Sequence, residues 1–538
     1  MTSDNSMSTP TELPACITRD NLTSPYFPSL SFARLIAVCT LSGIFMLTAF
    51  NRLNHTDLWG HLNFGRWMAE HQALPATDPF ATAPAATPVL QAAWLSQLAG
   101  YEVQTHFGNE GLALGHALLV TLTAGIVMLA AVRRGAPALW AWAAGLAMFL
   151  LDLPIVGTIR PQLFGQLGLA LVLLACAEMP RRTHPLLWLP VVAALWVNLH
   201  GSILMGIAVL GIYAASVSWT AWQEAGGDAA KLLRDRRLYV VWGALLLVLA
   251  AACLNPHGPQ LLARVLLFNE HAALSSISEW RPLSPLSLTG GLMIVSVGLA
   301  ALLARCSAKK WELYEIGLLL LFGLATLPAI RMLAWWAIVW PVVCIPHAAA
   351  AWRKRLADRA GEPAQAGDEP TAMRTVLAMG FVFMTLLVAP PTFAIVAGYG
   401  RGEGAITVTD TPIYVADEAV RRDLSGNIAA PMDWSDFLVW KSGGRLKPLV
   451  HSHVHLTELD TWRDYEAVFR GDEVWLHLLR GHHMQYVLVQ KKRYPDLLKA
   501  ILMEDRSGQG GVRIIYQDQR CLLAEVLPAK PVAVKPAS

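Results

Sequence analysis

The chain has 538 residues, of which 54% are hydrophobic and only 15% charged, and its mean hydropathy is +0.42. Soluble domains carry about 25% charged residues, so this composition excludes an ordinary soluble domain and indicates an integral membrane protein. The net charge is only +3, and no basic stripe is interleaved with aromatic residues, so no nucleic-acid partner is expected.

Apolar runs dominate the chain from residue 32 onward, after a polar N-terminal segment, 1–31, that is expected to be disordered and cytoplasmic. A membrane-spanning helix needs roughly 20 predominantly apolar residues. The expected fold class is therefore mainly α, a polytopic helical membrane protein. The pattern predicts about eleven spans, several of them short: 32–50, 110–132, 138–154, 161–179, 185–200, 202–222, 238–254, 287–304, 312–330, 332–350 and 374–397.

Basic residues gather in alternate connections between these runs. Connections rich in Lys and Arg face the cytoplasm, which places the N-terminus inside and the first connection, 51–109, outside. An odd number of spans then places the chain after residue 397 outside as well. The five basic connections carry Arg133 and Arg134; Arg181 and Arg182; Lys231, Arg234, Arg236 and Arg237; Arg305, Lys309 and Lys310; and Arg353, Lys354, Arg355 and Arg359.

The region after the last span is water-soluble in composition. The transmembrane domain is predicted over 32–397, with a flexible linker at 360–371, and a small α/β domain over 398–527, followed by a flexible tail, 528–538. Short apolar runs alternate there with helical patterns. The expected strands are Tyr486–Val489, Val512–Tyr516 and Cys521–Val526, and the expected helices are Asp433–Lys441 and Tyr494–Met503.

Unusual polar residues collect on the predicted outer side. The cytoplasmic ends show plain Arg and Lys clusters, whereas the outer ends carry acids, histidines and isolated arginines. This distribution suits a membrane protein whose chemistry takes place at its outer surface. The candidates are Asp57, His61 and Asp78 in the first outer loop, followed by Arg160, Asn198, His200, His257, Glu279 and Arg331.

Each candidate in the first loop has a structural alternative. Asp57 lies four residues before His61, so both would share one face of a short interfacial helix running from Asp57 to about residue 70. Asp57 is then either a functional carboxylate or a wetted loop acid. Asp78 followed by Pro79 has the pattern of a helix cap with proline at the first helical position. This pattern predicts that a second helix starts at Asp78. Asp78 is then either a structural cap or a catalytic residue.

The later candidates are open in the same way. Arg160 and Arg331 are either snorkelling anchors or a clamp for a lipid phosphate. His200 and His257 are either interfacial hydrogen-bonding groups or parts of a site, and Glu279 belongs either to a packing loop or to that site. Only their grouping on one side favours function.

Several motifs resemble one superfamily. The first loop contains Asp57-x-Trp59-x-His61-Leu62-x-x-Gly65-x-x-Met68, then Leu74-Pro75-x-x-Asp78-Pro79-Phe80 and Trp94-Leu95. Together these resemble the first outer loop of GT-C-type polytopic membrane glycosyltransferases, and more closely a poorly characterised bacterial branch. The likeness runs from residue 50 to 526. Further branch motifs are Arg160-Pro161-Gln162, Trp196-x-Asn198-x-His200-Gly201, Asn255-Pro256-x-Gly258, Glu279-Trp280 and Asp433-Trp434-x-x-Phe437-Leu438-x-Trp440.

The resemblance implies a role for Asp57. In characterised GT-C enzymes an acid of the first outer loop is the catalytic base or a metal ligand, the donor is a sugar on a polyprenyl phosphate, and transfer inverts the anomeric centre. Two features depart from the pattern. Adjacent acids are common there, whereas Asp57 stands alone. The branch often has Asp-x-Arg where this chain has His451, His453 and His455.

Metal dependence is therefore open, and no cofactor is certain. The three alternating histidines would share one face of a strand, where they either bind a metal or form a solvated polar surface. The seven cysteines are scattered without a Cys-x-x-Cys pair, which indicates neither a disulfide framework nor a zinc site.

The main hypothesis is a glycosyltransferase of the bacterial inner membrane that transfers a hexosyl or pentosyl group to an extracytoplasmic acceptor. Asp57 would be the base, His61 or Asp78 would orient it or the sugar, and Arg160 with Arg331 would neutralise the departing lipid phosphate. The expected partners are the polyprenyl-phosphate sugar donor, the acceptor and membrane lipids. The alternatives are a transporter or flippase for a lipid-linked substrate and a non-catalytic membrane assembly protein of envelope polysaccharide synthesis.

Overall fold

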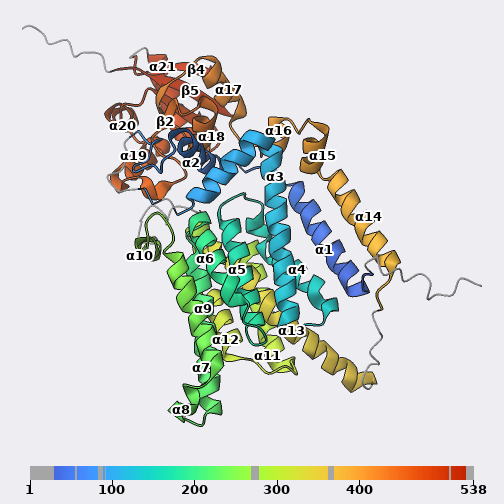
Figure 1. Cartoon of the computed structure of the whole chain (residues 1–538). Coiled ribbons are helices and arrows are strands. Elements are labelled where there is room, and N and C mark those ends of the chain that lie inside the picture. Colours follow the sequence, from blue (N-terminus) through green and yellow to red (C-terminus); the bar gives the residue numbers. More distant parts are fainter. Residues whose placement is uncertain are drawn as a thin grey trace, which may run out of the picture.

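The computed structural model describes residues 29–54, 57–82, 89–90, 92–267, 278–360, 369–507 and 510–528. The expected disordered N-terminus, the linker and the tail lie largely outside these residues. Each of the eleven apolar runs forms a helix (Figure 1). These helices are α1 Phe32–Ala49, α3 Trp94–Arg133, α4 Ala141–Val156, α5 Gln162–Glu178, α6 Pro185–Leu199, α7 Ile203–Glu224, α9 Arg236–Ala252, α11 Leu288–Cys306, α12 Leu313–Ala325, α13 Leu333–Ala360 and α14 Ala372–Val388 with α15 Pro390–Ala397.

Not all of these helices have the length of a full span. Within the described residues, six are long and apolar enough to cross a membrane, and α14 with α15 would make a seventh although the two are bent by 71°. Three further apolar helices, α5, α6 and α12, are shorter. The protein is thus a multi-pass helical membrane protein, and the count of about eleven crossings stays a prediction.

Close helix contacts hold the bundle together around Trp196. Its indole is 2% exposed, and a Cβ atom added at Gly168 of α5 or Gly206 of α7 would lie 2.5 or 2.7 Å from the ring. Small residues at these two positions let α5 and α7 approach the tryptophan, as is common in membrane helix packing. Trp196 also donates from Nε1 to Ser202 Oγ at 3.0 Å.

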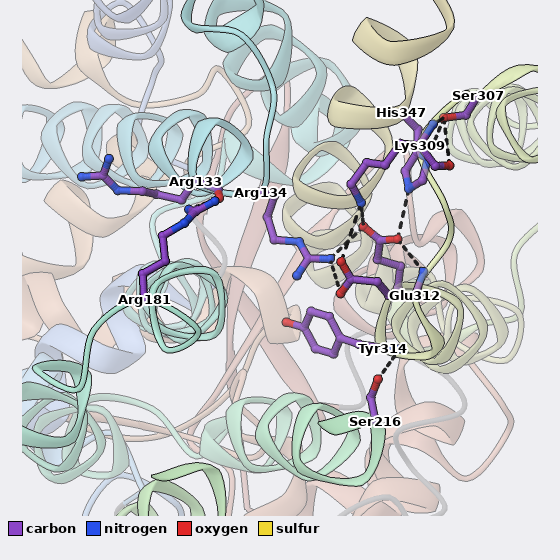
Figure 2. A network of polar contacts seen from close by, with 10 residues as sticks. Arg133, Arg134, Arg181, Ser216, Ser307, Lys309, Glu312, Tyr314 and His347 are labelled. Atoms are coloured by element: carbon purple, nitrogen blue, oxygen red, sulfur yellow. Dashed lines mark hydrogen bonds and ion pairs between the residues drawn. The ribbon is translucent and has the colours of Figure 1, made fainter. Parts of the chain in front are cut away.

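A buried ionic network joins helices at the end of the bundle away from the C-terminal domain (Figure 2). Its centre is Glu315 of α12, whose side chain is fully buried. Arg134, which follows α3, donates to Glu315 at 2.7 Å and to Glu312 at 3.0 Å. His347 of α13 contacts the same carboxylate at 3.1 Å. Lys309, in the connection before α12, contacts it at 2.5 Å. Two residues from the predicted basic connections thus serve as internal counter-ions.

The first outer loop forms a helix, α2 Leu58–His71, close to the predicted limits of Asp57 to about residue 70. The expected helix start at Asp78 is wrong, because residues 78–82 form bends and the next helix, α3, begins at Trp94. The first part of α3 reaches out of the bundle beside α2, and the helix changes direction at Gly108, whose φ is +62°.

The C-terminal domain contains a five-stranded sheet with the order β2-β1-β3-β5-β4. The strands β1, β2 and β3 are parallel, whereas β5 runs antiparallel to β3 and β4. The three predicted strands are confirmed. The strands are β1 Gly426–Ala429, β2 Leu446–Pro448, β3 Tyr486–Gln490, β4 Val512–Gln517 and β5 Cys521–Val526, and the helices include α17 Ile413–Arg421, α18 Met432–Ser442, α19 Leu459–Arg470, α20 Trp475–Gly481 and α21 Pro495–Ser507.

Helix α2 shares a hydrophobic core with this domain. Trp59 and Leu62 of α2 pack in one buried cluster with Phe437 of α18, Leu488 of β3 and Leu523 of β5. The rings of Trp59 and Phe437 meet edge to face at 5.1 Å. Burying a large apolar side chain contributes about 1.5–3 kcal/mol, so the first loop is held firmly against the sheet domain. Leu53 also pairs with Thr407 in a short parallel bridge.

Candidate active site

A chain of opposite charges lies between the bundle and α2. Asp57 directly precedes α2, and Arg160 lies between α4 and α5; Arg160 Nε is 2.9 Å from Asp57 Oδ2. Arg160 also forms an ion pair with Glu279, and Arg331 Nη1 lies 3.9 Å from the same glutamate. The Arg331 guanidinium sits over the Trp280 ring, 4.3 Å from its centre. Four residues distant in sequence thus form one alternating line of charge.

The backbone at Asp57 is unusual. Its φ is +51° and its ψ is −38°, a left-handed conformation that residues other than glycine seldom adopt. The side chain makes no capping hydrogen bond to α2, although Asp57 occupies the cap position. A strained residue that forgoes the local hydrogen bond is typical of functional positions.

These residues line one cavity of about 1850 Å³. Its wall includes the line of charge, part of the C-terminal domain and an apolar surface of the bundle. The C-terminal domain contributes Ser452, His453 and His455, and the apolar surface comes from α7, α12 and α13, with Leu204, Met205, Ala208, Phe322 and Trp335. The cavity therefore passes from a charged region to a hydrocarbon-like one.

His61 lies one turn after Asp57 and faces the same cavity. The Gln97 side-chain amide contacts His61 Nδ1 at 3.1 Å, and the ring packs edge to face on His453 at 5.0 Å. Burial lowers the pKa of His61 to about 4, with Asp57 opposing and Arg160 adding to that effect. The imidazole is thus neutral at physiological pH and suited to orienting a hydroxyl group.

His200 follows α6 in the cavity wall. Its Nδ1 contacts Ser202 Oγ at 2.7 Å and accepts a hydrogen bond from the Ser202 backbone N–H at 3.3 Å. Because Nδ1 is the acceptor, the proton of a neutral ring sits on Nε2. The same serine accepts from Trp196, so the Trp-x-Asn-x-His-Gly motif fixes the orientation of this histidine.

Six of the nine predicted site residues line the cavity: Asp57, His61, Arg160, His200, Glu279 and Arg331. The other three do not. Asn198 accepts from Trp94 Nε1 at 2.7 Å and donates to the Ala194 and Leu254 carbonyls, which is a packing role. His257 follows Asn255 in the turn after α9 and lies outside the cavity wall.

Asp78 is buried and pairs with His451 at 2.5 Å instead of facing the cavity. Its Oδ1 accepts from the Phe80 backbone N–H at 3.0 Å. Although burial opposes the charged form, Asp78 and Asp436 raise the pKa of His451 to about 9. Burial raises the pKa of Asp436 itself to about 6.

The expected strand carrying three histidines is absent. β2 ends at Pro448, and residues 454–456 form a 3-10 turn, so His451 points into the protein whereas His453 and His455 line the cavity. Sequence reasoning also missed Gln97 and the pair of Asp433 and Arg493, whose side chains meet at 2.7 Å at the cavity wall. The spacing of Gln97 gave no signal, because its approach to His61 depends on how α3 packs on α2.

No protein-family model matches this sequence, and no curated protein matches it. Solved structures do resemble it. The archaeal oligosaccharyltransferase AglB from Archaeoglobus fulgidus, solved with an inhibitory peptide and a dolichol-phosphate, has a TM-score of 0.52 at 13% identity, over 90% of this chain and 72% of AglB. ArnT from Cupriavidus metallidurans, bound to undecaprenyl phosphate, has a TM-score of 0.50 at 14% identity, over 93% of this chain and 99% of ArnT.

The arabinofuranosyltransferase AftD from Mycobacteria has a TM-score of 0.50 at 18% identity, over 93% of this chain but only 40% of AftD. At such identities the likeness bears on architecture. It extends over nearly the whole of this chain, bundle and C-terminal domain together. The chain therefore shares the overall fold of AglB, ArnT and AftD.

Proposed function

We propose that this chain is an inner-membrane glycosyltransferase that moves a sugar from a polyprenyl-phosphate donor to an extracytoplasmic glycan, lipid or protein. The observation that carries the proposal is the cavity in which Asp57 meets Arg160 and Arg331 beside an apolar wall. The solved relatives AglB and ArnT hold dolichol-phosphate and undecaprenyl phosphate, which supports a lipid-linked donor.

The two arginines suit the donor phosphate. Both contact Glu279, so their guanidinium groups lie close enough to share one anion. Guanidinium groups bind phosphate oxygens through paired hydrogen bonds. A phosphate would compete with Glu279 and Asp57 for Arg160, and this exchange would release the Asp57 carboxylate at the moment the donor is seated. The prenyl chain would lie along Leu204, Met205 and Phe322.

Asp57 would then act as the general base. The acceptor hydroxyl gives its proton to the Asp57 carboxylate while its oxygen bonds to the anomeric carbon. The bond between that carbon and the phosphate oxygen breaks, and the polyprenyl phosphate leaves with the electron pair. Arg160 and Arg331 stabilise the negative charge that grows on the departing phosphate. His61, neutral and fixed by Gln97, would position the acceptor or the sugar.

The orientation follows from charge. Arg134 and Lys309, from two of the basic connections, lie at the end of the bundle away from the C-terminal domain, whereas that domain helps to line the cavity, and this supports the proposed orientation with an extracytoplasmic site. A non-catalytic assembly protein would need no cavity that joins Asp57 to both arginines, so the geometry favours the enzyme over that alternative. A transporter or flippase remains the second candidate from sequence, with no structural feature that favours it.

The test is transfer from lipid-linked sugars in membranes of host cells that lack the native chain. Asp57→Asn should reduce transfer of labelled sugar at least a hundredfold, since a general base contributes roughly 10²–10⁴ in rate. Asp460→Asn, at an exposed acid of α19, is the matched control and should transfer normally. Wild-type transfer by Asp57→Asn at normal membrane abundance would refute the assignment of Asp57. Flux of lipid-linked sugar across vesicles without any new glycosidic product would instead favour a flippase.

A further inference from the structure

Three side chains of metal-ligand type meet beside the cavity, outside the line of charge at Asp57. Asp436 of α18 and the two histidines that follow β2, His451 and His453, each place one oxygen or nitrogen within 4.8 Å of the others. Asp436 and His451 are 3% and 2% exposed. We propose that Asp436, His451 and His453 bind a divalent transition-metal ion, with Zn²⁺ the ion that this ligand set favours.

A carboxylate orients the ring of His451, as is usual for a histidine that binds a metal. Its Nε2 contacts the Asp78 carboxylate at 2.5 Å, while its Nδ1 points toward Asp436 Oδ1 at 3.8 Å. A ligating histidine almost always donates its second ring N–H to a carboxylate or carbonyl, which fixes the tautomer and the ring orientation. Asp78 supplies that carboxylate. The other ring nitrogen, Nδ1, lies 3.8 Å from Asp436 Oδ1 and accepts the His453 backbone N–H at 3.2 Å, so an ion bound at Nδ1 would take the place of that backbone hydrogen bond.

Asp436 is fixed in a similar way. Its Oδ2 accepts the Ser452 backbone N–H at 3.1 Å, and its backbone carbonyl accepts from Asn63 Nδ2 of α2 at 2.9 Å. One carboxylate oxygen is therefore occupied by the backbone. The other, Oδ1, faces the histidines.

His453 completes the set. Its Nε2 is buried and has no hydrogen-bond partner among the described residues. The ring packs against His61 at 5.0 Å and Phe64 at 4.8 Å, so it cannot turn freely. A buried nitrogen without a partner is unfavourable, and a bound ion would remove that cost for an imidazole placed beside the other two ligands.

Helix α2 leaves room at this point. A Cβ atom at Gly60 would lie 2.8 Å from Asp436 Oδ1, 2.9 Å from Ser452 Oγ and 3.0 Å from His453 Cε1. Three groups from the C-terminal domain thus converge on a spot that only glycine keeps open. Ser452 Oγ or a water molecule could provide a fourth ligand there.

The chemistry of the ligands selects the ion. Two imidazole nitrogens and one carboxylate suit Zn²⁺ and its transition-metal neighbours, whereas Mg²⁺ and Ca²⁺ prefer sites made of oxygen. Tetrahedral zinc with bonds of about 2.0–2.1 Å places its ligand atoms roughly 3.3 Å apart. The 3.8 Å between Asp436 Oδ1 and His451 Nδ1 needs only a small inward movement to reach that spacing.

This site agrees with the sequence in part: the alternating histidines were one alternative for binding a metal, and His451 and His453 are ligands here, whereas Asp436 was not a candidate and His455 is not in the set. The resemblance would place a metal on the acid of the first outer loop, Asp57, whereas all three ligands proposed here come from the C-terminal domain. The scattered cysteines indicated no zinc site, and the ligand set proposed here contains no cysteine. The ion would fix His453 in the cavity wall and, through Asp78, tie the first loop to the sheet domain.

The experiment measures metal in the purified full-length chain by mass spectrometry, without reference to activity. The wild type should retain about one zinc or related ion per chain after extensive dialysis, as a three-ligand site implies. His453→Gln and Asp436→Asn should lose it, and Asp78→Asn should weaken affinity for added Zn²⁺ about 10- to 100-fold. His477→Gln, at an exposed histidine of α20, is the control and should keep the ion.

A chain stripped by chelator gives a second measurement. Added Zn²⁺ should raise the melting temperature of the stripped wild type but not of His453→Gln, and added Co²⁺ should give visible absorption bands of a nitrogen–oxygen site. No retained metal together with no shift on adding Zn²⁺ would overturn the proposal, as would His453→Gln that holds as much metal as the wild type. Because neither readout is sugar transfer, the metal site and the proposed activity can fail independently.

Discussion

Asp78 and His451 form a buried pair across 373 positions of the chain: Asp78 Oδ2 lies 2.5 Å from His451 Nε2, and the two side chains are 2% and 3% exposed. The first outer loop and the C-terminal domain are thus connected by charge as well as by the shared core under α2. Asp78 is neither a helix cap nor part of the cavity wall, and its importance is in this connection.

Removing the pair should destabilise the protein. Asp78→Ala leaves His451 buried without its partner, and breaking a buried ion pair costs about 3–5 kcal/mol. The melting temperature of the purified chain should fall clearly. Asp460→Ala, which removes an exposed pair with Arg463, should change it little, since surface pairs contribute about 0–1 kcal/mol. Equal melting temperatures for the two variants would contradict the connecting role of Asp78.

Arg331 should matter for the lipid phosphate. Arg331→Lys keeps the charge but loses the planar group that faces Glu279 and stacks on Trp280. A hydrogen bond to a charged group contributes about 1.5–3 kcal/mol, so affinity for undecaprenyl phosphate in nanodiscs should fall about 10- to 100-fold. Native mass spectrometry can measure this. Arg264→Lys, at an exposed position of the short helix α10 (Gln260–Leu267), should bind like the wild type, and an unchanged affinity in Arg331→Lys would remove Arg331 from the phosphate site.

Glu315 should be needed for stability and not for the site. Glu315→Gln would remove the fully buried charge that pairs with Arg134 and Lys309 and leave them only the half-exposed Glu312, and breaking a buried ion pair costs about 3–5 kcal/mol. Glu312→Gln, at a side chain that is 50% exposed, should cost far less. The melting temperature should fall much more in Glu315→Gln than in Glu312→Gln. Folded protein of either variant should retain normal affinity for undecaprenyl phosphate. A loss of that affinity in folded Glu315→Gln would mean that the network acts on the cavity.

Gly60→Ala tests the space beside the proposed ion. Alanine in a helix interior is ordinarily favoured over glycine by about 1 kcal/mol, but here the new methyl group would press on Asp436, Ser452 and His453. The variant should lose bound metal. Gly43→Ala is the matched control, because a Cβ there meets nothing within 4 Å. Normal metal content in Gly60→Ala would show that the bound ion lies at another place in the protein.

The sequence predicted the parts of this structure that depend on local pattern. The apolar runs became helices, and α2 and three strands fell within a few residues of their expected limits. The periodicity of side chains along one element is enough for such predictions. The strands β1 and β2 were not predicted, because they have four and three residues and are defined by parallel pairing with distant strands.

The site was predicted only in part for a similar reason. The charge pattern placed Asp57, Arg160 and Arg331 on one side of the membrane, and the structure brings them to one cavity. No helix begins at Asp78, because its carboxylate accepts a hydrogen bond from the Phe80 backbone N–H and pairs with His451. His451 and His453 did not share a strand face, since the chain turns after Pro448. No spacing rule could have placed His453 against His61, because that contact depends on how two remote segments pack.

The shared core also sets an order of assembly. Trp59 and Leu62 of α2 are buried in one cluster with Leu488 and Leu523, and these two strand residues emerge from the ribosome more than 400 residues after α2. During that interval α2 has no complete surface on which to pack, and Asp57 has no fixed position relative to the C-terminal domain. A truncated product would therefore expose the apolar face of α2 and be open to proteolysis, and the surroundings of Asp57 would be complete only after the last strand is added.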